Sequence, residues 1–183
     1  MSDTKDNSQS TPSLWARIRS HRAGRWGIDI AIVLVIFSLI TAYQTRDLLD
    51  GDDPLPPMEL VSLDGTTLNL EEIDTRRTII YFWATWCGAC SMQSGAISNL
   101  YNREDDDLTI ISVVLHYESE EQVRSFVERE EIDYPVYLGT DSQAHRFNVS
   151  AFPTVYIIDG DRRIRHGLVG YTTGIGLRAR LWL

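Results

Sequence analysis

The stretch Trp83-Ala-Thr-Trp86-Cys87-Gly88-Ala89-Cys90 contains both cysteines of the chain, separated by two residues. The stretch begins at the last residue of the run Thr78-Ile-Ile-Tyr-Phe-Trp83. The β-branched and aromatic residues of this run predict a buried strand. The segment that follows, residues 91–101, predicts a helix. Cys87 is therefore expected where a strand ends and a helix begins.

This position favours a reactive thiolate at Cys87. The first amides of a helix have no partner within the helix, and the helix dipole adds partial positive charge there. In a Cys-X-X-Cys pair at such a place, the pKa of the first thiol is commonly lowered from about 8.5 to about 7 or below. Cys90 follows one helical turn later, close enough to form a disulfide. We therefore expect Cys87 to attack a substrate disulfide and Cys90 to resolve the mixed disulfide.

Composition limits the other functions that the chain could have. The 183 residues carry a formal charge of −9, and residues 44–183 hold 12 basic and 23 acidic residues. An acidic domain argues against nucleic acid as a partner. Two cysteines allow one intramolecular pairing, so no structural disulfide framework is possible. The first 53 residues do not look globular, and the rest suits one domain with a core.

Residues 27–43 form an apolar run that predicts one transmembrane helix. The run is near the lower length limit of about 17 residues, and Trp26 and Tyr43 flank it as interfacial aromatic residues do. Basic residues precede it and aspartates follow, so the positive-inside rule makes residues 1–26 a cytoplasmic tail. A cleaved signal peptide or a buried helix is the alternative, but no clear small-residue cleavage site follows.

The rest of the chain alternates strand-like and helix-like segments. Residues 44–57 predict a proline-containing linker, and residues 58–183 predict one domain. Asp64-Gly65 lies between two short strand-like runs and predicts a hairpin. Further strands are expected at 108–115, 152–158 and 164–170, and helices at 119–131, 141–147 and 173–183. This order predicts an α/β fold with a mixed central sheet flanked by helices and an N-terminal hairpin extension.

Three features, in this order, resemble the thioredoxin superfamily. They are the cysteine stretch on its strand, the later segment Val149-Ser-Ala-Phe152-Pro153-Thr154, and the closing hairpin and helix. The leading hairpin and the anchor are similar to the TlpA-like branch, whose members are tethered thiol-disulfide proteins of the bacterial periplasm. Gln44-Thr-Arg-Asp-Leu48 and the C-terminal run 176–183 look most like the D-type proteins of the suppressor-of-copper-sensitivity group.

The resemblance implies a role for each site residue. Cys87 is the exposed nucleophile and Cys90 the shielded resolving thiol, while Trp86 offers apolar contact to the substrate. Pro153 is cis and lies against the cysteine pair, and the backbone of Phe152 pairs with an extended substrate strand. The resemblance also implies an inner-membrane, single-pass protein whose domain lies in the periplasm and needs no cofactor. Its partners are periplasmic protein thiols and disulfides and, if the chain reduces them, a membrane electron-donor protein.

The residues indicate less clearly whether the chain reduces or oxidises its substrates than that it exchanges disulfides. Gly88-Ala89 is close to the Gly-Pro of reducing thioredoxins, which favours a protein-disulfide reductase. A disulfide-donating oxidase of the same fold is one alternative. A tethered Cu(I)-binding module is another, because soft thiolates suit Cu(I). A zinc site would need four ligands, and His116, His145 and His166 show no paired spacing, so no metal site is predicted.

The sequence departs from the family at three positions near the cysteines. Tyr81 stands where thioredoxins have a buried Asp, Gln93 where the TlpA-like branch often has a Glu, and Gly95 where a Pro is usual. The usual buried carboxylate, a proton acceptor for the resolving thiol, is therefore missing from both places. A carboxylate from elsewhere in the fold, or water, is expected to replace it.

Overall fold

The computed structural model describes residues 22–45, 48–49, 53–103 and 107–182. The chain divides into two compact units, Met1–Ala42 and Tyr43–Leu183. Helix α2 (Arg22–Thr45) holds the stretch Trp26–Tyr43, which is long and apolar enough to cross a membrane, a property that a signal sequence shares. The predicted cytoplasmic tail lies outside the described residues up to residue 21.

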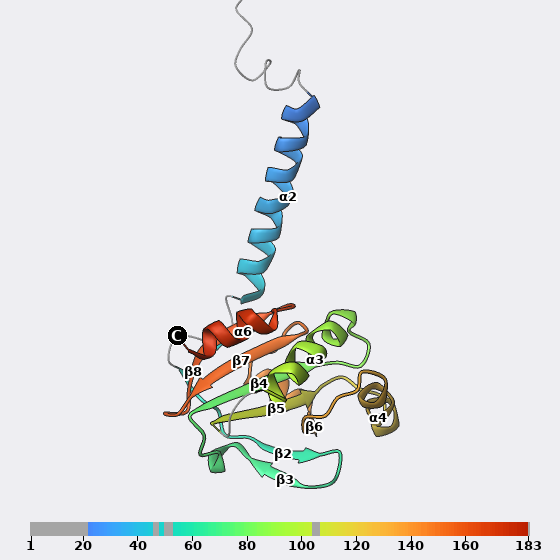
Figure 1. Ribbon diagram of the computed structural model, residues 1–183, viewed down its shortest axis with the longest axis vertical. Coiled ribbons are helices and arrows are strands. Elements are labelled where there is room, and N and C mark those ends of the chain that lie inside the picture. The colour runs from blue at the N-terminus through green and yellow to red at the C-terminus, as the bar shows by residue number, and fades with distance from the viewer. Residues whose placement is uncertain (1–21, 46–47, 50–52, 104–106, 183) are drawn as a thin grey trace, which may run out of the picture. The chain divides into compact units, whose positions relative to one another are not determined.

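In the described part of the second unit, eight strands form one mixed sheet in the order β1-β8-β7-β4-β5-β6-β2-β3 (Figure 1). Their bounds are β1 (Asp53–Pro54), β2 (Glu59–Ser62), β3 (Thr67–Asn69), β4 (Arg77–Trp83), β5 (Leu108–Val114), β6 (Val136–Leu138), β7 (Thr154–Asp159) and β8 (Arg163–Val169). The strand that leads to the cysteines, β4, runs parallel to β5 and antiparallel to β7. It therefore lies inside the sheet, as its apolar sequence predicts.

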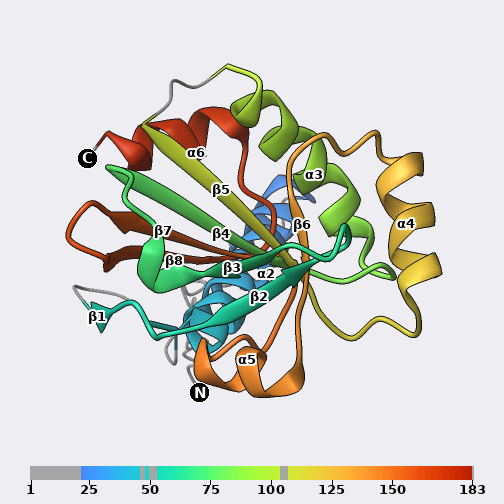
Figure 2. The same ribbon diagram turned by 90° about the horizontal axis from the view of Figure 1, so that it is seen from below.

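Helices cover both faces of this sheet. They are the 3₁₀ helix η1 (Leu70–Glu72) and the α-helices α3 (Gly88–Tyr101), α4 (Glu120–Arg129), α5 (Asp141–Arg146) and α6 (Gly174–Leu181). Residues of α3, α4 and α6 belong to one core cluster, and residues of α5 and η1 belong to the other. Figure 2 shows α5 on the side of the sheet opposite α3 and α6. The predicted mixed sheet between helices is confirmed.

Alternate residues of β4 supply these two cores. Ile79, Tyr81 and Trp83 face the cluster with α3, whereas Ile80 and Phe82 face the cluster with α5, and all five side chains are fully buried. Each apolar side chain buried in this way contributes about 1.5–3 kcal/mol. The end of β4, from which the cysteine stretch starts, is therefore firmly held.

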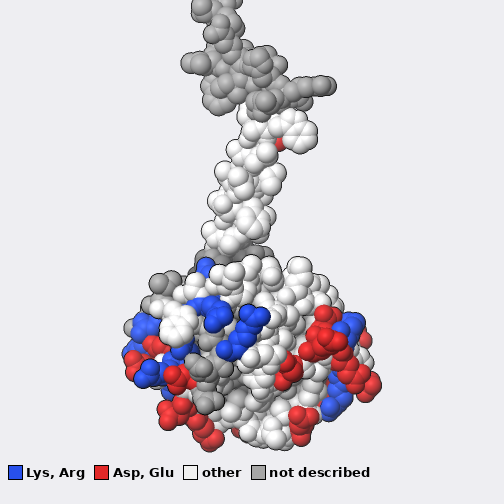
Figure 3. Space-filling model, viewed as in Figure 1, with Lys and Arg blue, Asp and Glu red and all other residues white. Residues whose placement is uncertain are grey.

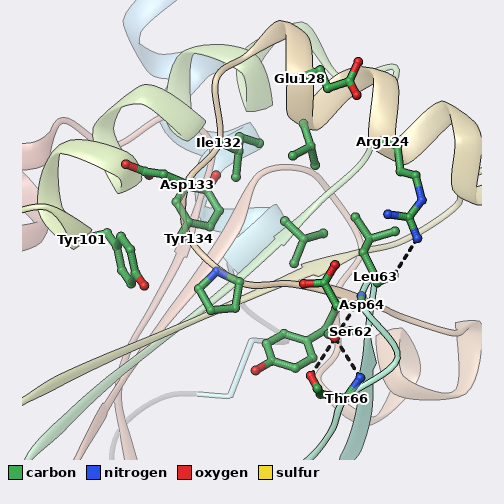
Figure 4. Close-up of a pocket in the computed structure, with 14 residues that line it drawn as sticks. Ser62, Leu63, Asp64, Thr66, Tyr101, Arg124, Glu128, Ile132, Asp133 and Tyr134 are labelled. Carbon is green, nitrogen blue, oxygen red and sulfur yellow. Dashed lines mark hydrogen bonds between the residues drawn. The ribbon is translucent and has the colours of Figure 1, made fainter.

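The predicted hairpin is present as β2 and β3, which pair antiparallel. Its turn contains Gly65 with a φ of +81°, a left-handed conformation that glycine adopts without strain. Strand β2 also pairs with β6, so the hairpin extends the sheet. Arg124 on α4 donates to the carbonyl oxygen of Leu63 at 2.6 Å and ties the hairpin to that helix (Figure 4).

Part of the segment expected as a linker, residues 44–57, is built into the domain. Strand β1 pairs with β8, and Leu55 is buried. Leu48 and Leu49 pack against the core cluster that contains α5. A Cβ atom added to Gly167 on β8 would lie 2.8 Å from the carbonyl oxygen of Leu49, so this close approach requires glycine. The three prolines of this segment led to the prediction of a linker, so its packing against the domain was not predicted.

Candidate active site

Cys87 and Cys90 form a disulfide at the start of α3, with their Cα atoms 5.2 Å apart. Cys87 is the N-cap residue of the helix, and its Sγ accepts a hydrogen bond from the backbone N–H of Cys90 at 3.2 Å. An amide at a helix N-terminus that points at a sulfur stabilises negative charge on that sulfur. The geometry therefore favours a thiolate at Cys87 once the disulfide is reduced.

The two cysteines differ in exposure less than the sequence suggests. Cys90 is fully buried, as expected of the resolving thiol, and Cys87 retains 8% of its surface where an exposed nucleophile was expected. The difference arises because Cys87 is joined to the buried Cys90 and belongs to the same core cluster. In the disulfide form, Cys87 is the more accessible residue of the pair.

Three rings lie together at the end of the sheet next to the cysteines. Trp86 is 64% exposed, and its ring meets that of Phe152 edge-on with centroids 5.8 Å apart. The ring of His116, directly after β5, also lies edge-on to that of Phe152, with centroids 5.5 Å apart. The Trp86 indole N–H donates to the carbonyl oxygen of His116 at 3.3 Å. These contacts join the ends of β4 and β5 to the loop before β7.

From the sequence, His116 has no assigned role and counts only as a histidine without the paired spacing of a zinc site. It is exposed, and its Nε2 lies 3.3 Å from the Asp141 carboxylate, but its ring also supports Phe152. Its φ of +52° is a left-handed conformation in which few residues other than glycine occur. The position after a strand was the available signal, and the ring contact with Phe152 could not be read from the sequence.

The predicted cis bond between Phe152 and Pro153 is present. The backbone N–H of Gly170 donates to the carbonyl oxygen of Pro153 at 2.8 Å, and Thr154 Oγ1 donates to that of Ala151 at 2.7 Å. Pro153 is buried, while Phe152 is partly exposed. The loop before β7 is thus held from both sides, with the Phe152 side chain turned toward Trp86.

Hydroxyl groups lie behind Cys90. The Tyr81 hydroxyl and Ser94 Oγ each donate to the carbonyl oxygen of Cys90, both at 3.0 Å. Tyr134 adds another buried ring, whose hydroxyl has no hydrogen-bond partner among the described residues. Burial raises the pKa of Tyr81 and of Tyr134 well above the ordinary value, so both hydroxyls are neutral at physiological pH. Tyr81 therefore does not supply the charge of the acid that it replaces.

Two polar residues of α3 close to the cysteines contact other parts of the fold. Ser91 Oγ donates a hydrogen bond to Glu130, which follows α4. Gln93 is fully buried, and its Oε1 accepts from the backbone N–H of Thr172 at 2.7 Å, linking α3 to the segment before α6. Sequence reasoning missed Ser91, Ser94, Glu130 and Tyr134, because only the fold brings residues 130 and 134 against the cysteine helix.

A cavity of about 520 Å³ lies between the hairpin, α4 and residues 132–137. Figure 4 shows Tyr101, Tyr134 and Asp133 on one side of it and Arg124 on the other. Neither cysteine lines it. The cavity is thus separate from the disulfide, although the buried Tyr134 of its wall belongs to the same core cluster as both cysteines.

Charge is unevenly distributed around the domain. Figure 3 shows acidic side chains gathered over α4 and basic ones over α6 and the neighbouring end of the sheet. Helix α4 carries Glu120, Glu121 and Glu128, and α6 carries Arg178 and Arg180. Helix α3 has no charged residue. Among the described residues, no group of three or more His, Cys, Asp or Glu side chains is placed to hold a metal ion.

The Redoxin family model matches residues 51–175 of the chain. The thioredoxin-like protein YneN of Bacillus subtilis (strain 168) is 25% identical over 156 residues, which is 81% of this chain and 92% of that protein. The thiol-disulfide oxidoreductase ResA of the same strain is 25% identical over 150 residues, 79% of this chain and 83% of the relative. These relatives confirm the predicted resemblance to thioredoxin-like proteins.

Solved structures show the same fold. A putative thiol:disulfide interchange protein DsbE from Chlorobium tepidum superposes with a TM-score of 0.66 at 20% identity, covering 73% of this chain and 96% of that one. StoA from Bacillus subtilis superposes with a TM-score of 0.60 at 18% identity, covering 71% and 98%. The α/β fold predicted from the sequence is therefore confirmed by known structures.

Proposed function

The chain belongs to the Redoxin family, and on this premise we propose that it is a membrane-tethered thiol-disulfide oxidoreductase acting on periplasmic proteins through Cys87 and Cys90. The observation that carries the proposal is the position of Cys87 at the N-cap of α3, where the Cys90 amide points at its sulfur. That arrangement lowers the cost of a thiolate at the more accessible cysteine.

In the reducing direction, the Cys87 thiolate attacks one sulfur of a substrate disulfide. The substrate S–S bond breaks, its other sulfur leaves as a thiolate and takes a proton, and a mixed disulfide with Cys87 forms. Cys90 then loses its proton and attacks Cys87 Sγ, which releases the second substrate thiol and forms the Cys87–Cys90 disulfide. Two electrons pass from the pair to the substrate, so the exchange itself uses no cofactor.

Trp86, Phe152 and Pro153 form the proposed substrate-binding surface. Trp86 and Phe152 offer rings next to the cysteines, and aromatic residues of this kind anchor protein–protein contacts. Proline has no amide hydrogen, so at Pro153 an approaching chain meets no competing donor. The backbone of Phe152 is then the group that pairs with an extended substrate segment.

We favour the reducing direction because Gly88-Ala89 is close to the Gly-Pro pair of reducing thioredoxins. A reductant in an oxidising compartment needs a supply of electrons, so a membrane protein that donates them is part of the proposal. Tethering raises the effective concentration of the domain near such a donor. The stretch Trp26–Tyr43 is the proposed anchor, with basic residues before it marking the cytoplasmic side.

Within the TlpA-like branch, we assign the chain to the D-type proteins of the suppressor-of-copper-sensitivity group. The assignment rests on two sequence segments, residues 44–48 and 176–183. A link to copper handling is not needed for the redox chemistry proposed above, so the two proposals stand separately.

The reduction potential of the Cys87–Cys90 pair tests the function. The full-length chain is equilibrated with glutathione and dithiothreitol couples, and the oxidised fraction is read from alkylation mass shifts. A value near about −270 mV supports a reductase, and one near about −120 mV supports an oxidase. If no reversible disulfide forms, the proposal fails, and a Cu(I) titration against a competing chelator then tests the metal-binding alternative.

Trapping experiments assign the two thiols. Cys90→Ser should accumulate mixed disulfides between Cys87 and periplasmic proteins, because the resolving thiol is gone. Cys87→Ser should accumulate none. Equal trapping by both variants would contradict the assigned roles.

A further inference from the structure

The chain after β5 is held in place where it reaches the rings beside the cysteines. The backbone N–H of Leu115 donates to the carbonyl oxygen of Trp83 at 2.8 Å, so the end of β5 stays joined to the end of β4. His116 follows with a φ of +52°. A residue other than glycine in this region carries backbone strain and persists where the surrounding contacts fix it. The contacts of His116 therefore determine how this segment meets the rings.

His116 contacts Trp86 and Phe152 in different ways. Its carbonyl oxygen accepts a hydrogen bond from the Trp86 indole N–H at 3.3 Å, and its imidazole lies edge-on to the Phe152 ring with centroids 5.5 Å apart. The Trp86 and Phe152 rings also meet edge-on, at 5.8 Å. Edge-on ring pairs at such distances are favourable beyond the area that they bury. The backbone of His116 thus orients Trp86, while its side chain supports Phe152.

A carboxylate from another element lies beside the imidazole. Nε2 of His116 is 3.3 Å from Oδ1 of Asp141, which lies in the first turn of α5. Both side chains are exposed, at 47% and 82%, so the pair contributes little free energy by itself. It gives the imidazole one partner on α5 in addition to the Phe152 ring in the loop before β7. Two partners on different elements limit the orientations that the imidazole can take.

The orientation of Trp86 and Phe152 matters because a bound substrate has to immobilise them. Trp86 is 64% exposed and Phe152 is partly exposed. Side chains that are held in their bound orientation beforehand reduce the entropy that binding costs. A protein substrate that covers both rings gains from this, whereas a molecule as small as glutathione covers little of them. Contacts that fix the rings therefore favour protein disulfides over small ones.

We propose that His116 is a positioning residue that sets the preference for protein disulfides by holding Trp86 and Phe152 in place. The inference rests on the proposed thiol-disulfide function and on the substrate-binding surface assigned to these rings. His116 acts through the rings and not on the sulfur atoms, so the reduction potential of the cysteine pair should not depend on it. Its effect should appear in how tightly a protein substrate binds, and not in the rate of exchange once it is bound.

His116→Asn tests the proposal. Asn is also found at positive φ, so this variant keeps the carbonyl oxygen in place for Trp86 and removes only the imidazole. The reduced full-length chain in detergent micelles is mixed with insulin, as the protein disulfide, or with glutathione disulfide. Formation of the Cys87–Cys90 disulfide is then read from alkylation mass shifts. If His116→Asn is unstable, His116→Gly takes its place, because glycine adopts positive φ freely.

We expect the second-order rate constant with insulin to fall about twofold to tenfold in His116→Asn, the range that one edge-on ring pair is worth. The rate at saturating insulin should be unchanged. The rate with glutathione disulfide and the reduction potential of the cysteine pair should both match the wild type. An unchanged rate with glutathione disulfide also shows that the variant is folded.

Further variants identify the part of the side chain that acts. His116→Phe keeps a ring beside Phe152 and should recover most of the rate constant with insulin. Asp141→Ala leaves the imidazole without its partner on α5 and should lower that rate constant about twofold or less. His145→Asn is the matched control, because it makes the same substitution at an exposed histidine of α5. It should react with both substrates as the wild type does.

Three outcomes would overturn the inference. The first is a His116→Asn variant that reacts with insulin as fast as His145→Asn. The second is an equal loss with insulin and glutathione disulfide, or a shifted reduction potential, since either places the effect on the cysteines. The third is a loss that His116→Phe does not recover, which assigns it to the imidazole nitrogens. In all three the wild type still exchanges with both substrates.

The wild type separates failure of this inference from failure of the proposed function. If the wild type exchanges with glutathione disulfide but not with insulin, the substrate-binding surface and the role of His116 are both wrong, while the thiol chemistry stands. Absence of exchange with either substrate contradicts the proposed function itself.

Discussion

The hydroxyl of Tyr81 donates a hydrogen bond to the carbonyl oxygen of Cys90, with the two atoms 3.0 Å apart. Tyr81 is a fully buried residue of β4, and Cys90 lies in the first turn of α3. Ser94 donates to the same carbonyl oxygen from within the helix. The strand thus holds the cysteine helix through a neutral group at the position where the wider superfamily has an acid.

Replacing Tyr81 with Phe should remove this bond and keep the ring packing. Ser94 still donates to Cys90, so we expect the free energy of unfolding to fall by about 1 kcal/mol rather than by the larger cost of an unsatisfied buried acceptor. Urea unfolding of the reduced and oxidised chain measures it. Tyr101→Phe, at a 42% exposed position, is the control and should change stability by much less. Equal effects would contradict a role of the Tyr81 hydroxyl.

Trp86→Ala should weaken exchange with protein disulfides and spare exchange with glutathione. Trp86 is 64% exposed and contacts Phe152, so its loss removes binding surface without opening the core. Loss of an aromatic anchor costs about 2 kcal/mol, so we expect kcat/KM for a protein substrate to fall roughly tenfold or more. Trp182→Ala, at a 68% exposed position near the C-terminus, should leave the rate unchanged. An equal loss with both substrates would show that Trp86 acts on the cysteines themselves.

Two glycine-to-alanine substitutions should change stability in opposite directions. A Cβ at Gly139 would lie 2.6 Å from side-chain atoms of Val113 and Leu115 and 2.9 Å from the carbonyl oxygen of Val114, so we expect a loss of about 1–3 kcal/mol. Gly95 is exposed within α3, and a Cβ there would meet open space, so Ala should add about 0.5–1 kcal/mol. Denaturant unfolding measures the free energy of unfolding of both variants and so checks the direction of each change. An unchanged m-value shows that the variants unfold by the same transition as the wild type.

Asp159 should make stability depend on acid pH. Burial opposes its ionisation, but the backbone N–H of Arg163 and the Arg165 side chain donate to the carboxylate and lower its pKa below the ordinary value. Since the folded pKa lies below the unfolded one, this stabilisation is present above about pH 4 and is lost as the pH falls through the folded pKa. Asp159→Asn should therefore cost up to about 1 kcal/mol at pH 7 and nothing at about pH 2.

The exposed neighbour Asp161 provides the control for this pH dependence. Asp161→Asn should track the wild type in urea unfolding at each pH. The free energies of unfolding of Asp159→Asn and the wild type should become equal in strong acid. If their difference persists unchanged there, the ion pair and hydrogen bonds of the Asp159 carboxylate are not its source.

Local signals account for what could be predicted near the cysteines. The residues from Thr78 to Tyr101 predict a buried strand followed by a helix from their local pattern alone. Both elements form as expected. The Asp64-Gly65 turn and its flanking runs are equally local. The packing of Leu48 and Leu49 was missed because it depends on a glycine at position 167, far along the chain.

The sequence by itself determined the chemistry of this protein: two thiols at a strand-to-helix junction, with no carboxylate at positions 81 and 93. Only the tertiary structure decided what surrounds those thiols. The strand order brings Tyr81 under Cys90, the end of α4 brings Glu130 to Ser91, and the end of β5 brings His116 to Phe152. Spacing along the chain specifies local geometry, whereas contacts between residues far apart in the sequence follow from how helices and strands pack.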